Sequence, residues 1–236
     1  MHRTVLACDY DGTLAAEGTM SEATRKALRR LRESGRRLVM VTGRELPDLK
    51  RVCPGLDLFD WIVAENGALL YDPRSGEEIP LAPAPPDEFV RALAARNIQP
   101  LSVGRVIVAT REPYERDVEN TIRTLGLKFD IILNKGAVMV LPAGVDKASG
   151  LAAALKKLRI SPRNAVAVGD GENDRALLAL AGCAVAVANA LPSLKQVADL
   201  VTEKPAGDGV IELVERLLEN DLADVGETKD RTVSPG

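Results

Sequence analysis

Short apolar runs alternate with amphipathic stretches in the first third of the chain, and the same pattern returns after about residue 145. Apolar runs of four or five residues are typical of buried strands, whereas apolar residues that recur every three or four positions indicate helices. We expect strands at Thr4–Cys8, Leu38–Val41, Trp61–Ala64, Ala165–Val168 and Ala184–Val187. We expect helices at Ser21–Ser34, Glu45–Val52, Asp146–Leu158, Asn173–Ala181, Ser193–Ala198 and Val210–Glu219. Because the two types alternate, they favour a parallel sheet with right-handed crossovers.

The middle of the chain has a different pattern. Ile79–Asp87 is rich in proline and is expected to be a stiff linker. The elements expected beyond it are helices at Asp87–Arg96 and Glu112–Leu125 and strands at Ser102–Thr110, Lys128–Leu133 and Ala137–Leu141. The last two strands are joined by a turn at Asn134–Gly136, which indicates a hairpin and hence an antiparallel or mixed sheet.

These patterns predict an α/β protein with a Rossmann-like parallel-sheet core and helices on both faces. The core is expected to comprise residues 1–80 and 145–218, with a small α+β domain inserted at residues 81–144. The polar segment over residues 219–236 is expected to be a disordered tail.

Composition excludes several classes of function. The 236 residues carry a formal net charge of −3, which does not favour a nucleic-acid-binding surface. Cys8, Cys53 and Cys183 form no CxxC pair, which argues against a disulfide framework or a cysteine-rich zinc site. His2 is the one histidine, so catalysis would rest on carboxylates, lysine, arginine and hydroxyls. With no long apolar run and no signal-peptide core, the expectation is a soluble cytoplasmic protein.

Four groups of polar residues stand out near the ends of expected core strands, where open parallel sheets bind ligands. The first is the pair Asp9 and Asp11, followed by Gly12, which permits a sharp turn. One carboxylate could act as a nucleophile and the other as a proton donor or acceptor, and a divalent cation would stabilise two close acids. The alternative is an acidic turn that caps the next helix.

The second and third groups could bind phosphate. Thr42, Gly43 and Arg44 offer a hydroxyl, an accessible N–H and a guanidinium after a strand. Lys147 lies in the first turn of a helix, where a cation opposes the helix dipole unless an anion is close. An ordinary turn and a solvated lysine are the alternatives.

The fourth group is the loop from Gly169 to Asp174, which holds three acids and two glycines between a strand and a helix. Oxygen ligands on a loop suit Mg²⁺, which usually keeps several waters and takes one or two protein carboxylates. A helix cap needs one acid rather than three, although an acidic capping run is the simpler alternative.

The order of these groups resembles the haloacid dehalogenase-like (HAD) phosphohydrolase superfamily, over the chain to about residue 218. The stretches that begin at Asp9 and at Gly169 carry most of the resemblance. The insert falls between the second and third motifs, as does the type II cap of the superfamily. Asn66–Ala68 and Gly144–Lys147 are similar to the Cof-like sugar-phosphatase branch.

The resemblance implies a role for each residue. Asp9 would attack phosphorus and form an aspartyl-phosphate, while Asp11 would protonate the leaving group and then activate water. The Mg²⁺ ligands would be Asp9, the main-chain carbonyl of Asp11, and Asp170, with Asp174 as a further ligand or an outer partner. The residues that would contact the phosphoryl group are Thr42, Gly43, Lys147 and Asn173. Arg44 and Asn66 are candidate substrate-binding residues.

The insert adds less specific candidates. Its arginines are expected to be mostly solvated, although one or two could face the core and recognise a substrate carboxylate or hydroxyl: Arg91, Arg96, Arg105, Arg111, Arg116 and Arg123. Asn134 and Lys135, in the hairpin turn, are further candidates.

The expected function is therefore a Mg²⁺-dependent phosphatase that acts on a small phosphorylated metabolite, such as a sugar phosphate, a phosphosugar acid or phosphoglycolate. We expect no nucleic-acid or membrane partner, and a monomer or a homodimer. One alternative is a phosphomutase of the phosphomannomutase type, which would retain the phosphoryl group. A non-enzymatic alternative is a phospho-accepting, receiver-like signalling domain, although its acceptor would follow a middle strand and the insert would be unexplained.

Overall fold

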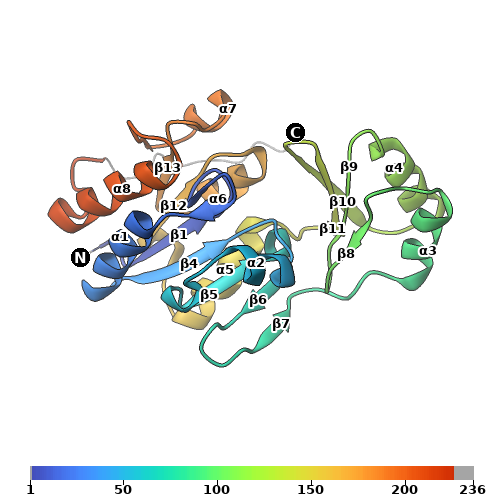
Figure 1. Ribbon diagram of the computed structural model, residues 1–236, viewed down its shortest axis with the longest axis horizontal. Coiled ribbons are helices and arrows are strands. Elements are labelled where there is room, and N and C mark those ends of the chain that lie inside the picture. The colour runs from blue at the N-terminus through green and yellow to red at the C-terminus, as the bar shows by residue number, and fades with distance from the viewer. Residues whose placement is uncertain (1, 226–236) are drawn as a thin grey trace.

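The larger of two main sheets has eight strands within residues 2–225, the part of the chain that the computed structural model describes. Their order is β14-β13-β12-β1-β4-β5-β6-β7 (Figure 1). The strands are β1 (Val5–Asp9), β4 (Arg37–Val41), β5 (Trp61–Ala64), β6 (Leu69–Tyr71), β7 (Glu78–Pro80), β12 (Ala165–Gly169), β13 (Cys183–Ala186) and β14 (Leu200–Val201). The six strands from β14 to β5 are parallel, so the predicted parallel core is confirmed.

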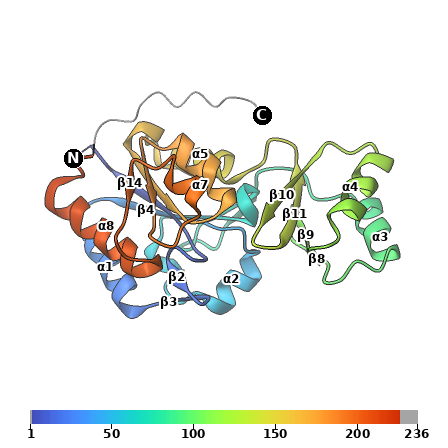
Figure 2. The same cartoon turned by 90° about the horizontal axis from the view of Figure 1, so that it is seen from above.

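Helices cover both faces of this sheet. On one face α1 (Glu22–Glu33) packs against α8 (Ala206–Asn220), and on the other α5 (Lys147–Leu158) packs against α6 (Arg175–Leu180) (Figures 1 and 2). Two shorter helices are α2 (Leu46–Val52) and α7 (Pro192–Lys195). Short 3₁₀ turns are Leu56–Leu58, Glu65–Gly67, Pro162–Asn164 and Glu172–Asp174.

All five residues of β1 are buried, because helices cover both faces of the strand. This explains why its sequence is an uninterrupted apolar run before Asp9. Ser21 caps α1, since its hydroxyl accepts a hydrogen bond from the main chain of Thr24 at 3.1 Å.

Two antiparallel strands, β6 and β7, extend the core sheet beyond β5 and were not expected. The predicted linker at Ile79–Asp87 is therefore wrong at its start, because Ile79 and Pro80 belong to β7. A small hairpin of β2 (Ala15–Ala16) and β3 (Thr19–Met20) follows Asp11, and it too was not expected.

The second main sheet has four strands in the order β10-β11-β9-β8. It is formed by β8 (Ser102–Val103), β9 (Val108–Arg111), β10 (Phe129–Asn134) and β11 (Ala137–Pro142), and its pairs are antiparallel. Helices α3 (Asp87–Ala95) and α4 (Glu115–Thr124) lie on its far side, so its other face turns toward the core (Figure 2). We call these six elements the cap.

The predicted strand at Ser102–Thr110 is two strands, β8 and β9, with a loop over residues 104–107 between them. The cap has its own apolar cluster, which includes Phe89, Leu93, Val118 and Val140. A disordered tail was expected from residue 219, but α8 continues to Asn220, and Leu222 is 1% exposed in the core cluster. Residues 226–236 lie outside the described part.

Candidate active site at the edge of the core sheet

The predicted polar groups meet at the carboxyl edge of the parallel strands. Asp9 is the last residue of β1 and pairs in register with Val41 of β4, while Cys8 pairs with Val168 of β12. Asp170 therefore follows β12 next to Asp9, and Thr42 follows β4. Lys147 reaches the same edge from the first turn of α5.

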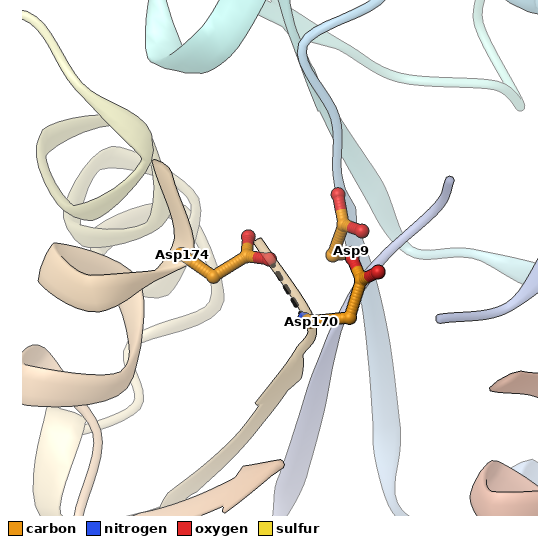
Figure 3. Close-up of side chains that lie close together, drawn as sticks. All are labelled: Asp9, Asp170 and Asp174. Atoms are coloured by element: carbon orange, nitrogen blue, oxygen red, sulfur yellow. Dashed lines mark hydrogen bonds between the residues drawn. The ribbon is translucent and has the colours of Figure 1, made fainter. Parts of the chain in front are cut away.

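Three carboxylates form a buried cluster at this edge. Asp9, Asp170 and Asp174 are at most 4% exposed, and each offers an oxygen within 4.8 Å of the others (Figure 3). The ammonium of Lys147, 1% exposed, donates to Asp9 Oδ1 at 2.6 Å and to Asp174 Oδ1 at 2.6 Å. A lysine buried this deeply requires such anions, since an isolated buried charge is very costly.

Asp174 shapes the loop that carries Asp170. Its Oδ2 accepts hydrogen bonds from the main-chain N–H groups of Asp170 and Gly171, both at 2.9 Å (Figure 3 shows the first). Since Lys147 occupies its other oxygen, Asp174 is already engaged through both oxygens. This arrangement favours an orienting role over a direct metal ligand.

Burial changes the acid–base behaviour of the cluster. Burial, together with the charge of Asp174, raises the pKa of Asp9 to about 7, although Lys147 opposes the shift. Burial also raises the pKa of Asp170. For Lys147, burial lowers the pKa, but the charges of Asp174 and Asp9 outweigh burial and raise it. The site therefore holds a permanent cation among acids whose ionisation is costly without further positive charge.

The side chain of Asp11 points elsewhere. It receives two hydrogen bonds of 2.7 Å from the guanidinium of Arg44, which also pairs with Asp48. The Asp11 side chain is 42% exposed, and it lies outside the carboxylate cluster. Its main-chain carbonyl, in contrast, faces the cluster and accepts a hydrogen bond from Lys135 at 3.3 Å.

The candidate phosphate-binding groups lie beside Thr42. The Thr42 hydroxyl accepts from the main chain of Arg44 at 3.1 Å. Asn173 donates to Asn66 Oδ1 at 2.8 Å, and both side chains lie within 4 Å of where a Cβ on Gly43 would be. Asn66 Nδ2 and Asn173 Oδ1 are buried and have no partner. The partnerless donor, Asn66 Nδ2, suits an anionic ligand, whereas the partnerless acceptor, Asn173 Oδ1, suits a hydroxyl or another donor.

Lys135 is the cap residue that reaches the cluster. Its ammonium lies 2.8 Å from Asp170 Oδ2. Within residues 2–225, none of the expected cap arginines has a hydrogen bond to the four aspartates of the site, which are Asp9, Asp11, Asp170 and Asp174. Arg105, for example, pairs with Glu78 instead, and Arg96 with Asp117.

Two residues of the site were not expected from the sequence. Asn189, after β13, donates to the Gly12 carbonyl at 2.8 Å and to Asp170 Oδ2 at 3.3 Å. Glu65, after β5, binds main-chain N–H groups of the cap. Each lies one to three residues beyond a core strand, so the strand-end rule that found Asp9 could also have found them.

The donor set fits a hard divalent cation. The nearby ligand atoms are carboxylate oxygens of Asp9 and Asp170 and the carbonyl oxygen of Asp11, and oxygen ligands are those that Mg²⁺ prefers. The Lys135 ammonium already bridges the last two groups, which shows that these oxygens converge on a positive charge.

Comparison with known proteins identifies the family. The profile of the haloacid dehalogenase-like hydrolases matches residues 6–105 and 105–214. Phosphoglycolate phosphatase 2 of Saccharolobus solfataricus is 33% identical over 222 residues, which cover 91% of this chain and 92% of that protein. Phosphoglycolate phosphatase of Methanopyrus kandleri is 32% identical, over 89% of this chain and 95% of its own. The chain belongs to the haloacid dehalogenase-like hydrolases.

Solved structures agree on the fold. A haloacid dehalogenase-like hydrolase from Bacteroides thetaiotaomicron superposes with a TM-score of 0.75 at 24% identity. The match covers 91% of this chain and 99% of that one, so it includes the cap as well as the core. Within the described residues, no helix is both long and apolar enough to cross a membrane.

Proposed function

We propose that the protein hydrolyses a small phosphorylated metabolite with the help of bound Mg²⁺, and that Asp9 is the nucleophile. The chain is a phosphoric monoester hydrolase by its family and its named relatives. The observation that carries the proposed mechanism is the buried Asp9 carboxylate, which Lys147 holds at the edge of the sheet beside Asp170.

Asp9, Asp170 and the main-chain carbonyl of Asp11 would hold the cation, and Asp174 would orient the loop of Asp170. When bound, Mg²⁺ supplies positive charge that offsets both the carboxylates and the transferring phosphoryl group. Lys147 supplies permanent charge at the same place, and phosphoryl transfer depends mainly on such positioning and charge neutralisation.

In the first step, an oxygen of Asp9 forms a bond to phosphorus, and the bond between phosphorus and the ester oxygen breaks. Asp11 gives a proton to the departing alkoxide. In the second step, Asp11 takes a proton from water, which attacks phosphorus and releases phosphate from Asp9. For both steps the Asp11 carboxyl turns from Arg44 toward the ester oxygen, which its partial exposure permits.

Thr42, the N–H of Gly43, Lys147 and the amide of Asn173 would bind the phosphoryl oxygens. The buried Nδ2 of Asn66 supports a phosphoryl site here, because it is a donor without a partner that an anionic oxygen would satisfy, whereas the partnerless Oδ1 of Asn173 is an acceptor and would take a donor of the substrate. Arg44 contributes by holding Asp11 between turnovers.

Phosphoglycolate is the substrate that the relatives' names suggest, and a small ester fits a site that the cap approaches through Lys135. We propose that the enzyme acts without a nucleic-acid or membrane partner, as a monomer or a homodimer, in the cytoplasm.

The test is phosphate release from a panel of phosphorylated metabolites, with Mg²⁺ and with EDTA. We expect phosphate release with Mg²⁺ but not with EDTA. The rate of release should fall by at least about a thousandfold in Asp9→Asn, because this variant keeps the size of the side chain but not the nucleophile. Asp57→Asn, at an exposed position, is the matched control. Turnover retained in Asp9→Asn would refute the assignment of Asp9 as the nucleophile. Phosphate release that survives EDTA would refute the requirement for a metal ion.

A further inference from the structure

Lys135 connects the cap to the carboxylate cluster. It lies in the tight turn between β10 and β11, with a φ of 49°, and its side chain is 48% exposed. Its ammonium donates to Asp170 Oδ2 at 2.8 Å and to the Asp11 carbonyl at 3.3 Å. Within residues 2–225 no other cap side chain has a hydrogen bond to the four aspartates of the site.

The core is shaped to accept this turn. A Cβ on Gly12 would lie 2.3 Å from Asp170 Oδ2 and 3.0 Å from the Lys135 ammonium, so a side chain there would displace the contact. A Cβ on Gly171 would lie 2.7 Å from Asn134 Oδ1. Two glycines of the predicted catalytic loops therefore leave room for Asn134 and Lys135.

The two groups that Lys135 contacts are those assigned above to the divalent cation. An ammonium and a divalent cation repel each other, and they cannot occupy the same position between these oxygens. The ammonium must therefore leave Asp170 when the cation binds. Since β10 ends beside the Glu172–Asp174 turn and Asn134 lies next to Gly171, the charged end of Lys135 stays close to the site.

A displaced ammonium at the mouth of the site needs a new anion. The phosphoryl group already has Lys147, which the fold holds in place by two ion pairs. The remaining part of the substrate is the one that faces the cap. The Lys135 side chain is half exposed to solvent, so its positive charge is available to a substrate anion.

We propose that Lys135 is a specificity-determining residue that pairs with a second anionic group of the substrate, a carboxylate, and so selects acidic phosphate esters over neutral ones. This inference rests on the proposed function. Without the cation, Lys135 rests on Asp170 and competes with divalent metal. With the cation and substrate bound, it binds the substrate carboxylate.

The kinetic test compares 2-phosphoglycolate with ethyl phosphate, which replaces the carboxylate by a methyl group. The measured quantity is the ratio of kcat/KM for the two esters. We expect Lys135→Met to lower this ratio by about 10–100-fold, as for loss of a charge-assisted hydrogen bond. Lys135→Arg should restore part of the preference. Lys128→Met is the control, because Lys128 lies at the other end of β10, about 20 Å away, and should leave the ratio unchanged.

A second test needs no turnover. Titration of the free protein with Mn²⁺ in a calorimeter should show affinity at least about threefold higher in Lys135→Met than in the wild type, because the competing ammonium is gone. Lys128→Met should bind Mn²⁺ as the wild type does.

The outcomes separate the two proposals. A wild-type protein that releases phosphate from no ester of the metabolite panel refutes the proposed function. One that hydrolyses other esters of the panel but prefers neutral ones to 2-phosphoglycolate refutes the selection of acidic esters alone. If the wild type hydrolyses 2-phosphoglycolate but Lys135→Met keeps the same ratio, only the role of Lys135 is refuted. Mn²⁺ binding in Lys135→Met that is equal to or weaker than in the wild type refutes the competition between the Lys135 ammonium and the metal ion.

Discussion

At the scale of single residues, Glu65 is a buried side chain of the core that binds the main chain of the cap. It is 1% exposed, and its carboxylate accepts hydrogen bonds from the main-chain N–H groups of Arg105, Val106 and Ile107 at 2.8–3.0 Å. All three belong to the cap or its loop between β8 and β9. A Cβ on Gly104 would lie 2.6 Å from the same carboxylate, so the loop closes tightly around it.

We expect Glu65→Ala to lower the free energy of unfolding by about 3 kcal/mol, because three main-chain N–H groups, two of them buried, lose their shared acceptor. Urea denaturation would measure the effect. The control is Glu77→Ala, at an exposed position, which should change it by less than about 0.5 kcal/mol. Equal stability of the two variants would show that water or a neighbouring group replaces Glu65.

The raised pKa of Asp9 makes metal binding depend on pH. A protonated carboxyl is a poor ligand, so below its pKa of about 7 each unit of pH should weaken Mn²⁺ binding, by up to tenfold, and above it binding should level off. The effect of pH on the folding stability of the metal-free protein has the opposite sign. Since the folded state holds this proton over a pH range where the unfolded chain has lost it, this contribution to the stability of the metal-free protein declines as pH rises from about 4 to 7.

Calorimetric titration with Mn²⁺ between pH 5.5 and 8 would check the dependence. Asp9→Asn is the matched variant, because it has no proton to lose at this position. Its affinity should be lower and should change less steeply with pH. A wild-type curve as flat as that of the variant would contradict the assignment of the proton to Asp9.

The sequence locates the central residues of the site because of a simple geometric rule. Asp9 and Asp170 each follow a strand of one parallel sheet, so their side chains must meet at one edge. Asp11 was predicted as an acid and base, but the pairing of its carboxylate with Arg44 was not, because that pairing depends on how two loops face each other. Glu65 and Asn189 also follow core strands, but their partners lie in segments distant in sequence, so the strand-end rule gives their position and not their role.

At the scale of elements, α5 must lie very close to the turn after β5 in order to present Lys147. A Cβ on Gly150, in this helix, would lie 2.6 Å from the Cα of Gly67 and 2.4 Å from Val63. Gly67 itself has a φ of 112°, and a Cβ there would lie 1.8 Å from the Asp146 carbonyl. The two glycines allow helix and turn to touch backbone to backbone.

Gly150→Ala should therefore destabilise the protein, although alanine is favoured over glycine in a helix by about 1 kcal/mol. We expect a net loss of about 1–3 kcal/mol, as is typical of overpacking, and weaker phosphatase activity because Lys147 shifts with α5. Ala152→Gly, at an exposed position of the same helix, calibrates the intrinsic preference. A stabilised Gly150→Ala would show that α5 can move away from Gly67 freely.

Elements with a long local pattern were predicted well, and short ones were not. β1 is recognisable from its continuous run of buried residues, and α5 from its apolar stripe over 12 residues and its N-terminal cap. β6 and β7 have three residues each, too few to show a period. The expected strand at Ser102–Thr110 is interrupted because residues 104–107 fold around Glu65, and that partner comes from a distant part of the sequence.

At the scale of the whole molecule, Asp221 ties the two ends of the described chain to the core sheet. It follows α8 and pairs with the guanidinium of Arg36 at 2.8 Å, and it also accepts from the main chain of His2 and Arg3. Arg36 is 7% exposed and donates to the Leu217 carbonyl at 2.8 Å as well. The segment expected to be disordered from residue 219 thus contains a residue that is bound to the core.

Asp221→Asn should lower the free energy of unfolding at pH 7 by about 2 kcal/mol, because it leaves the charge of Arg36 buried with neutral partners only. The hydrogen bonds from Arg36 lower the pKa of Asp221, although burial opposes them. Since a depressed pKa gives stability that is present above the unfolded value near 4 and is lost below it, the difference between wild type and variant should shrink as pH falls below about 4.

Urea denaturation of the two proteins at pH 7 and at pH 3.5 tests both the size and the sign of this effect. Asp224→Asn is the control, because Asp224 pairs with Arg216 at an exposed position, where an ion pair contributes little. A difference between wild type and Asp221→Asn that stays constant down to pH 3.5 would mean that the carboxylate charge is not what stabilises Arg36. In that case the hydrogen bonds that Asp221 accepts, which asparagine keeps in part, would stabilise the core rather than the carboxylate charge.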